Sequence, residues 1–172
     1  METKDKIVEK YIELVLKRKT ADISVTEICK EAEISRKTFY NYFKDRLEVV
    51  EAVFIDDIEK PMRYGFEISM DPETITTIMY KNFLKKKDFY VITMKEEGKN
   101  TLFEDIIVRI QAFNIPYFQS KLSDTVDVEY LSYKFSALQA FMIRKWIIGG
   151  MKESPEYMAK MYFTDTRDVF LG

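Results

Sequence analysis

The sequence predicts an all-α protein of about nine helices. Hydrophobic residues make up 47% of the 172 residues, which is ample for a packed core, and only five Gly and four Pro are present. Helix-start signals recur along the chain, where Ser, Thr or Asp precedes an apolar pattern of helical period. No segment shows a convincing strand pattern. Together these observations favour a helical globular protein.

The first two helices are expected at residues 4–18 and 24–33. Apolar residues recur at helical spacing in the first, and three basic residues close it, where positive charge suits the negative end of the helix dipole. Ser24 and Glu27 form a capping box for the second, because the Ser side chain can accept from the third helical N–H while Glu reaches back.

Ser35 is expected to cap a short helix over residues 36–43, and Asp45 to cap the helix that follows. Two helices of about two turns separated by three or four residues match the helix-turn-helix pattern. Pro61 and Gly65 are expected to end the fourth helix.

Five further helices are expected at residues 71–86, 88–97, 101–121, 127–148 and 155–170. The first and last of these begin with an N-cap residue followed by Pro, a strong helix-start signal. Gly98 and Asn100 are expected to break the pattern, and Pro116 to kink the helix that contains it.

The composition argues against an enzyme. Histidine is absent, which excludes Ser–His and Cys–His nucleophilic arrangements and most zinc chemistry. No metalloprotease, phosphate-binding or dinucleotide-binding motif is present. We therefore expect no catalytic residues, no metal and no cofactor.

The cellular context is also constrained. Cys29 is the single cysteine, so no intrachain disulfide can form, and a lone thiol fits a reducing compartment. No stretch resembles a signal peptide or a membrane span. These features predict a soluble cytoplasmic protein with no membrane partner.

Charge is distributed unevenly along the chain. The net charge is −2, yet residues 1–50 hold 11 Lys/Arg against 10 Asp/Glu. The chain is no polycation, so any contact with nucleic acid must be local.

The third helix concentrates cations and hydroxyl groups. At about 100° per residue, Arg36, Lys37, Tyr40 and Lys44 fall within one arc about 100° wide. Arg can bridge two acceptors of guanine, Lys attracts phosphate, and hydroxyl and amide groups can contact phosphate or base edges. A solvated helix face is the alternative interpretation.

The aromatic residues of this helix form a second arc. Phe39 and Phe43 are predicted to be core, whereas Tyr42 is predicted either to join the core or to donate to phosphate. The predicted DNA-contacting set is Ser24, Thr26, Ser35, Arg36, Lys37, Thr38, Tyr40, Asn41, Tyr42, Lys44 and Arg46.

Residues 4–53 resemble the N-terminal domain of TetR-family transcriptional regulators. The matching stretches are Ser24-Val25-Thr26-Glu27-Ile28-Cys29-Lys30-Glu31-Ala32, Ile34-Ser35-Arg36-Lys37-Thr38-Phe39-Tyr40 and Tyr42-Phe43-Lys44-Asp45-Arg46. The resemblance implies a three-helix DNA-binding domain whose recognition helix is 35–42, with Tyr40 and Arg46 on phosphate. Glu33 stands where the family often has Gly, which predicts a looser turn and a carboxylate near DNA.

The resemblance also implies two domains, residues 1–50 for DNA binding and residues 51–172 for ligand binding and dimerisation. The homodimer would form through helices near 127–149 and 155–170. Aromatic and Met side chains of the second domain could line a ligand cavity or could equally fill the core. The predicted pocket set is Phe83, Tyr90, Met94, Phe103, Phe113, Tyr117, Met142 and Trp146.

The function that the resemblance implies is a ligand-responsive repressor that binds a near-palindromic operator in double-stranded DNA as a dimer and responds to an unknown small-molecule effector. The alternative is a helical ligand-binding or interaction module of the same fold that no longer binds operator DNA.

Overall fold

The computed structural model describes residues 2–97, 101–122 and 125–170, and these residues form helices with no strand among them. The elements are α1 (Thr3–Arg18), α2 (Val25–Glu31), α3 (Arg36–Tyr40), α4 (Arg46–Phe54), the π-helical segment η1 (Ile55–Glu59), α5 (Lys60–Glu67), α6 (Pro72–Lys85), α7 (Lys87–Thr93), α8 (Leu102–Lys121), α9 (Val128–Ile148) and α10 (Pro155–Phe170). Because α4, η1 and α5 run on without a break, the described residues hold nine separate helices, which confirms the predicted fold class.

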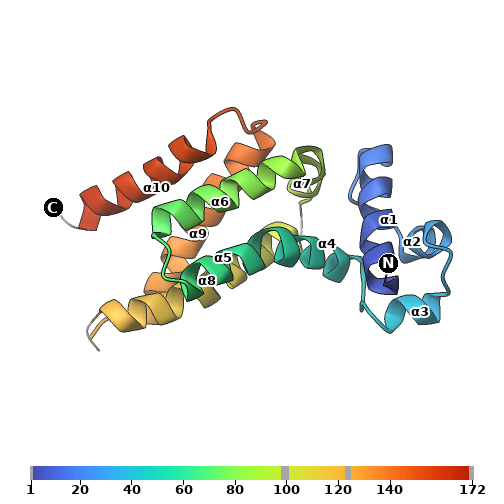
Figure 1. Cartoon of the computed structure of the whole chain (residues 1–172), viewed down its shortest axis with the longest axis horizontal. Coiled ribbons are helices and arrows are strands. Elements are labelled where there is room, and N and C mark those ends of the chain that lie inside the picture. The colour runs from blue at the N-terminus through green and yellow to red at the C-terminus, as the bar shows by residue number, and fades with distance from the viewer. Residues whose placement is uncertain (1, 98–100, 123–124, 171–172) are drawn as a thin grey trace.

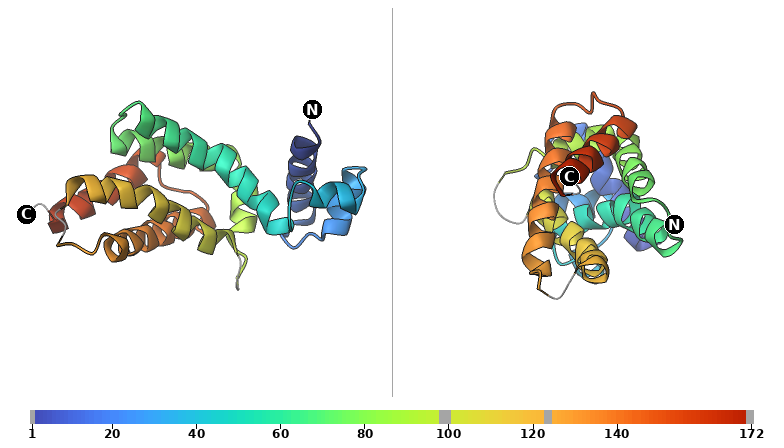
Figure 2. Two further views of the ribbon diagram at one scale, coloured as in Figure 1. Left: turned by 90° about the horizontal axis from the view of Figure 1, so that it is seen from below. Right: turned by 90° about the vertical axis from the view of Figure 1, so that its left-hand side faces the viewer.

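The molecule is elongated, with two groups of helices joined by one long helix (Figures 1 and 2). Helices α1, α2 and α3 form a small head at one end. The continuous helix α4–η1–α5 leads from this head into the larger group of α6, α8, α9 and α10. Helix α7 lies between the two groups, and the C-terminal end of α10 is far from the head.

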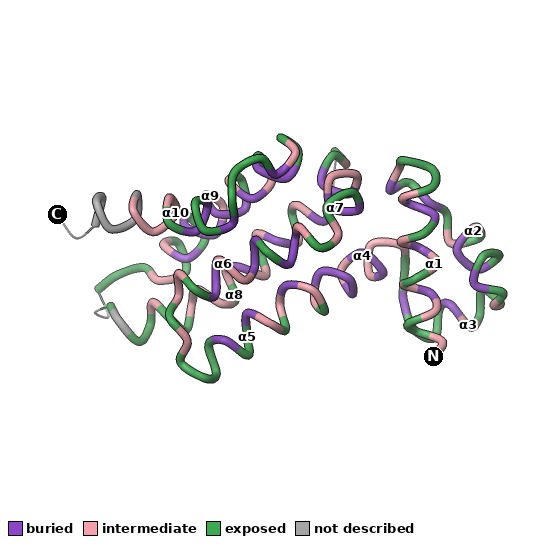
Figure 3. The backbone as a smooth tube through the Cα atoms, turned by 45° about the horizontal axis from the view of Figure 1, so that its top comes forward, coloured by how far each residue is buried: buried purple, intermediate pink, exposed green. Residues whose placement is uncertain are grey.

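One hydrophobic core runs through both groups. It extends from Ile7 of α1 through Phe54 and Phe83 to Ile147 of α9, and the buried sides of the helices face one another (Figure 3). The ring of Tyr11 in α1 meets that of Phe89 in α7 edge to face, with centroids 6.2 Å apart. The head is therefore packed against α7 as well as joined to α4.

The predicted N-caps are confirmed. Ser24 and Glu27 form both bonds of the capping box. Ser35 Oγ accepts from the Thr38 N–H at 3.0 Å, and Asp45 Oδ1 accepts from the Glu48 N–H at 3.1 Å. Each bond satisfies one of the N–H groups that a helix start leaves without an intrahelical partner, which explains why local sequence located these starts well.

The prediction that Pro61 ends the fourth helix is wrong. Pro61 has no N–H to give to the carbonyl of Asp57 four residues earlier. That carbonyl accepts instead from Asn82 Nδ2 of α6 at 2.8 Å. The preceding turn is π-helical, and the Lys60 N–H bonds to the Ile55 carbonyl. A side chain distant in sequence therefore replaces the missing donor, and the helix continues.

Gly65 does not end the helix either. Helix α5 passes through Gly65 to Glu67. A Cβ atom at Gly65 would lie 2.9 Å from Cγ1 of Ile75, closer than real contacts allow. The glycine is therefore needed for the close approach of α5 and α6. In the sequence, a glycine required for packing cannot be told apart from one that ends a helix.

Two other helices end earlier than expected. Helix α3 ends at Tyr40 rather than at residue 43, and helix α7 ends at Thr93 rather than at residue 97. Helix α8 continues through Pro116 to Lys121, the end that the sequence predicts. The predicted break at Gly98 and Asn100 lies outside the described residues.

Candidate functional site

The turn between α2 and α3 is tight despite its glutamate. Glu33 adopts φ 52°, in the left-handed region that favours glycine, and the Ile34 N–H donates to the Cys29 carbonyl at 3.0 Å. The expectation of a looser turn is therefore wrong, because Glu33 accepts the strained conformation that the turn requires. Its carboxylate meets Lys6 Nζ at 3.3 Å on the surface.

Helix α3 is anchored by one buried ring. Phe39 is fully buried and Phe43, just after the helix, is almost so, as the sequence predicted. On the outer side, Arg36 Nη2 donates to Tyr40 Oη at 3.3 Å, and the guanidinium stands 5.8 Å from the centre of the Tyr40 ring. Arg36 and Tyr40 are thus held side by side and outward.

The predicted DNA-contacting residues gather around this helix, and most face solvent. The exposed members are Ser24, Thr26, Ser35, Arg36, Lys37, Tyr40, Asn41, Tyr42 and Lys44, while Thr38 is half-buried. Tyr42 was predicted either to join the core or to donate to phosphate. It is 45% exposed and therefore does not belong to the core. Lys37 has no ion pair within the described part of the chain, and Lys44 pairs with Glu48 at 3.0 Å.

Arg46 is placed differently from the rest of the set. Its Nη1 donates to the Ala21 carbonyl of the head at 2.6 Å and to Glu96 Oε1, beyond α7, at 2.7 Å. The resemblance implied that this guanidinium contacts phosphate, but in the folded chain it pairs with the carboxylate of Glu96, 50 residues later. In this structure Arg46, at the start of the long helix, joins the head to the segment that follows α7.

A buried tyrosine completes this junction. Tyr11 Oη donates to the same Ala21 carbonyl at 3.1 Å. Burial raises the pKa of Tyr11 to about 12, so the phenol stays protonated and remains a donor at neutral pH.

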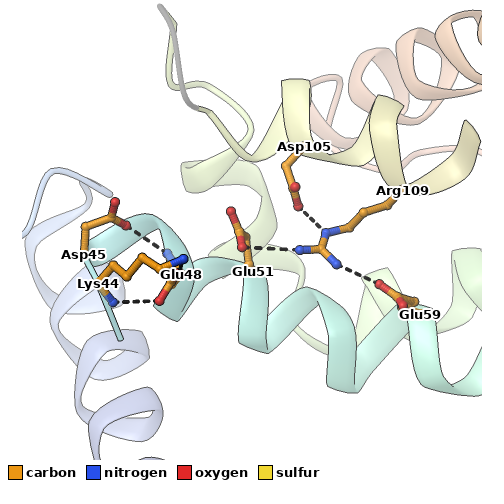
Figure 4. A network of polar contacts seen from close by, with 7 residues as sticks. All are labelled: Lys44, Asp45, Glu48, Glu51, Glu59, Asp105 and Arg109. Atoms are coloured by element: carbon orange, nitrogen blue, oxygen red, sulfur yellow. Dashed lines mark hydrogen bonds and ion pairs between the residues drawn. The ribbon is translucent and has the colours of Figure 1, made fainter. Parts of the chain in front are cut away.

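A second polar junction lies where α8 meets the long helix (Figure 4). Arg109 of α8 pairs with Glu59 at 2.9 Å and with Glu51 at 3.3 Å, and its Nε donates to Asp105 of its own helix. One guanidinium therefore faces three half-buried carboxylates. Burial, and next the nearby Asp105, raise the pKa of Glu51 above its ordinary value, while Arg109 opposes this.

A cavity of about 410 Å³ lies in the larger group of helices, bordered by α5, α6, α8, α9 and α10. Its lining is mainly aromatic and aliphatic. The lining residues are Met62, Phe66, Asp71, Pro72, Glu73, Thr76, Ile110, Phe113, Asn114, Tyr117, Phe118, Leu122, Leu131, Phe135, Gln139, Tyr162 and Phe163.

Two of the eight predicted pocket residues, Phe113 and Tyr117, line this cavity. The other six do not, and this corrects the prediction. Four of them are buried in the core: Phe83, Tyr90, Met94 and Trp146. Phe103 packs against the Phe141 ring, with centroids 5.0 Å apart, and Met142 is half-buried away from the cavity.

Sequence reasoning missed several residues that the fold brings together. Phe66 and Thr76 line the cavity from α5 and α6, and Gln139 lines it from α9. A weak signal existed for Gln139, which is the one amide on a helical face whose other members are apolar or small. Asp105 is the local partner of Arg109, but Glu51 and Glu59 lie 58 and 50 residues earlier in the chain, so local sequence carried no signal of the cluster.

Among the described residues, no group of three or more Cys, Asp or Glu side chains is arranged to hold a metal ion. None of the described helices combines the length and apolar character needed to cross a bilayer.

Comparison with protein families identifies the larger group of helices. Residues 70–166 match the family model described as the transcriptional regulator C-terminal region of TetR proteins. The match spans more than half of the chain. The chain belongs to the TetR family of transcriptional regulators.

Solved structures share the fold of this TetR-family regulator over nearly its whole length. A protein of Syntrophomonas wolfei str. Goettingen described as a TetR-family transcriptional regulator is 16% identical, with a TM-score of 0.72 over 99% of this chain and 96% of that one. The dihydroxyacetone kinase operon activator DhaS is 20% identical, with a TM-score of 0.64 over 94% and 92%.

A third similar structure holds a ligand. Thermus thermophilus FadR, a TetR-family transcriptional repressor solved in complex with lauroyl-CoA, is 16% identical, with a TM-score of 0.64 over 94% of this chain and 91% of that one. No curated protein matches the sequence.

The TetR-family regulator carries an apolar stripe on the outer side of α9, facing away from the core. Tyr130, Phe141 and Ile148 lie along this outer stripe and Tyr133 and Leu138 flank it, all five exposed. On the inner face of the same helix, Phe135 and Ile147 are buried within the protomer. A helix that is apolar on both faces has a second surface to cover.

Proposed function

We propose that this TetR-family regulator is a homodimeric, ligand-responsive repressor that binds a near-palindromic operator through α2 and α3. The observation that carries the proposal is the outer face of α3, where Arg36, Lys37 and Tyr40 stand exposed above the buried Phe39. An arginine held by Tyr40 is oriented to bridge two acceptors on a base edge, and the free ammonium of Lys37 suits phosphate.

The proposed DNA interface consists of the exposed members of the predicted set, with residues 1–50 as the DNA-binding part and residues 51–172 as the regulatory part. Two copies would place their α3 helices in successive major grooves, about 34–36 Å apart. The outer stripe of α9 and the exposed face of α10, where Tyr157 is solvent-facing, support dimerisation through these helices.

The cavity is the proposed effector site. Its volume of about 410 Å³ is within the range of about 300–1,000 Å³ typical of small-molecule pockets, and its lining is largely apolar. The lauroyl-CoA complex of FadR supports a small-molecule effector for a protein of this fold.

Contacts across the two polar junctions provide a route from effector to DNA. Ile110 and Phe113 of α8 line the cavity, while Arg109 beside them holds Glu51 and Glu59 of the long helix. Arg46 at the start of that helix holds the head through the Ala21 carbonyl. An effector that binds one arrangement of α8 more tightly would change the populations of head positions by that difference in affinity.

The test is a fluorescence titration of the full-length protein with duplex DNA from upstream of its own gene. Arg36→Ala should weaken binding about tenfold, as expected for about 1–3 kcal/mol per specific base contact, and Lys37→Ala should weaken binding to all sequences about equally. Lys37→Ala should also reduce the salt slope by about one. Tyr40→Phe should weaken binding too, and by a more similar factor for different DNA sequences than Arg36→Ala does.

The exposed Lys17, on α1 outside the predicted DNA-contacting set, provides a matched control, and Lys17→Ala should leave affinity unchanged. Absence of salt-dependent binding to any promoter DNA would contradict the proposal and favour a helical module that does not bind operators. A reporter gene then distinguishes repression, as in FadR, from activation, as in DhaS.

A further inference from the structure

The polar groups that line the cavity point to the class of its ligand. Seven aromatic side chains contribute to the lining, which suits a flat or aliphatic apolar body. Two buried polar side chains, Thr76 of α6 and Gln139 of α9, stand out in this lining, because an apolar ligand body cannot hydrogen-bond to them.

Thr76 and Gln139 are each only 5% exposed, and both line the cavity. Neither side chain has a hydrogen-bond partner among the residues that the structure describes, whereas the neighbouring Asn114 donates to Ser136 Oγ at 3.0 Å. Polar side chains inside folded proteins are nearly always hydrogen-bonded to protein or to water, so Thr76 and Gln139, which line the same cavity, take their partners from its contents.

The charges at the cavity restrict that partner further. The acidic lining residues are Asp71, which is exposed where it caps α6, and Glu73 in the first turn. No Lys or Arg is among the described residues that line the cavity. Among these described lining residues an anion would find no cation to pair with, and a charge of either sign placed beside the buried Gln139 and Thr76 would meet only neutral groups.

We infer that the cavity binds an uncharged amphipathic molecule, with its apolar body among the aromatic side chains and its hydrogen-bonding head on Gln139 and Thr76. The inference rests on the proposed function, in which this cavity is the effector site. Gln139 can both donate and accept, and the Thr76 hydroxyl can do the same, so an alcohol or a neutral amide satisfies them.

The test uses pyrene, a neutral hydrocarbon without hydrogen-bonding groups, as a fluorescent reporter of the cavity in the full-length protein. Three competitors share one chain and differ in the head group: 1-dodecanol, dodecanoate and dodecyltrimethylammonium, each kept below its aggregation threshold. At pH 7.5 dodecanol should displace pyrene at a concentration at least tenfold lower than either charged competitor.

Two near-isosteric variants assign this preference to residues. Gln139→Leu and Thr76→Val should each weaken the affinity for dodecanol about fivefold or more, while the affinity for pyrene stays within about twofold of the wild-type value. Gln119→Leu, an exposed amide on α8 outside the cavity, is the matched control and should change neither. Because Gln139→Leu removes an unpaired buried amide, its melting temperature should equal or exceed that of the wild type.

The outcomes separate the inference from the proposed function. Failure of pyrene to bind the wild-type cavity would contradict the effector site itself. Pyrene binding with equal competition by all three head groups, or with a charged competitor strongest, would overturn only the inference. A Gln139→Leu protein that binds dodecanol normally, or that melts at a lower temperature, would also overturn it, since the amide would then have a structural role.

Discussion

Glu33 holds a backbone conformation that a glycine would adopt more easily. Its φ of 52° places the Cβ near the carbonyl oxygen, at a cost of about 1–2 kcal/mol for a residue with a side chain. The ion pair with Lys6 compensates little, because the Glu33 side chain is 82% exposed and pairs of this kind contribute about 0–1 kcal/mol.

Glu33→Gly should therefore stabilise the protein by about 0.5–1 kcal/mol, after the extra chain entropy of glycine in the unfolded state is subtracted. The measurement is urea denaturation at pH 7. Glu31→Gly, at the last position of α2 and also exposed, is the control and should destabilise by about 1 kcal/mol. Equal destabilisation by both changes would refute the strain argument.

Glu51 makes a pH-dependent prediction at the same scale. Burial, and next Asp105, hold its pKa in the folded protein above the ordinary value of 4.5. The folded state therefore binds this proton more tightly than the unfolded state. The stabilising contribution of Glu51 is complete below pH 4.5 and is lost as the pH rises through the folded-state pKa.

Glu51→Gln should match the wild type in stability near pH 4 and become the more stable of the two as the pH rises toward 7. The amide oxygen can still accept from Arg109, so the packing is retained. Urea unfolding at several pH values measures this difference. A wild type that gains stability over the variant between pH 4 and pH 7 would show that Arg109 outweighs burial.

Glu59→Gln provides the contrast within the same cluster. Glu59 accepts from Arg63 at 2.8 Å and from Arg109 at 2.9 Å, and the substitution weakens both charge-assisted bonds. We expect this variant to be less stable than the wild type at pH 7.

At the scale of helices, the long helix α4–η1–α5 depends on a contact from outside itself. The Asp57 carbonyl has no helical donor, because Pro61 lacks an N–H, and it accepts from Asn82 Nδ2 instead. The Asp57 side chain is equally occupied, since Lys86 donates to Oδ1 at 2.5 Å and Tyr90 to Oδ2 at 2.9 Å. Helix α6 and the start of α7 thus hold the π-helical segment in place.

Asn82→Leu keeps most of the side-chain volume but removes the donor, and should destabilise by about 1–3 kcal/mol because the Asp57 carbonyl loses its partner. In a Pro61→Ala background the same change should cost clearly less, since residue 61 then has an N–H to offer. Urea denaturation of the four proteins gives the coupling energy. A cost that is equal in both backgrounds would contradict this account of the helix.

Helix starts and helix continuity differ in how well the sequence predicts them. Ser24, Ser35 and Asp45 were predicted as caps because each bond closes within three residues. Pro61 and Gly65 were misinterpreted because their neighbours, Asn82 and Ile75, come from α6. A breaker residue removes a local bond, but only the packed structure shows whether another group replaces it.

At the scale of the whole molecule, the outer stripe of α9 is the surface that a single copy leaves uncovered. Leu138 is 51% exposed in the middle of the helix. Burying such side chains against a second copy is favourable at about 25 cal/mol per Å² of apolar area. In the proposed dimer the two α3 helices would also be fixed relative to each other, which binding to two half-sites requires.

Leu138→Glu should shift the proposed dimer toward monomer and weaken operator binding at least tenfold, because a charge would be buried at the proposed interface without a partner. Sedimentation velocity and the DNA titration measure the two effects on one sample. Tyr64→Glu, at a still more exposed aromatic position on α5, is the control and should alter neither. A dimeric Leu138→Glu protein would place the interface elsewhere.

The sequence by itself determined the helical class, the starts of the helices and the exposed set around α3, since capping bonds and amphipathic periods act within a few residues. The tertiary structure decided that Arg46 turns inward to Glu96, that Arg109 gathers three carboxylates, and that Phe83 and Trp146 are core while Gln139 lines a cavity. Each of these depends on groups tens of residues apart, whose proximity is set only when the helices pack.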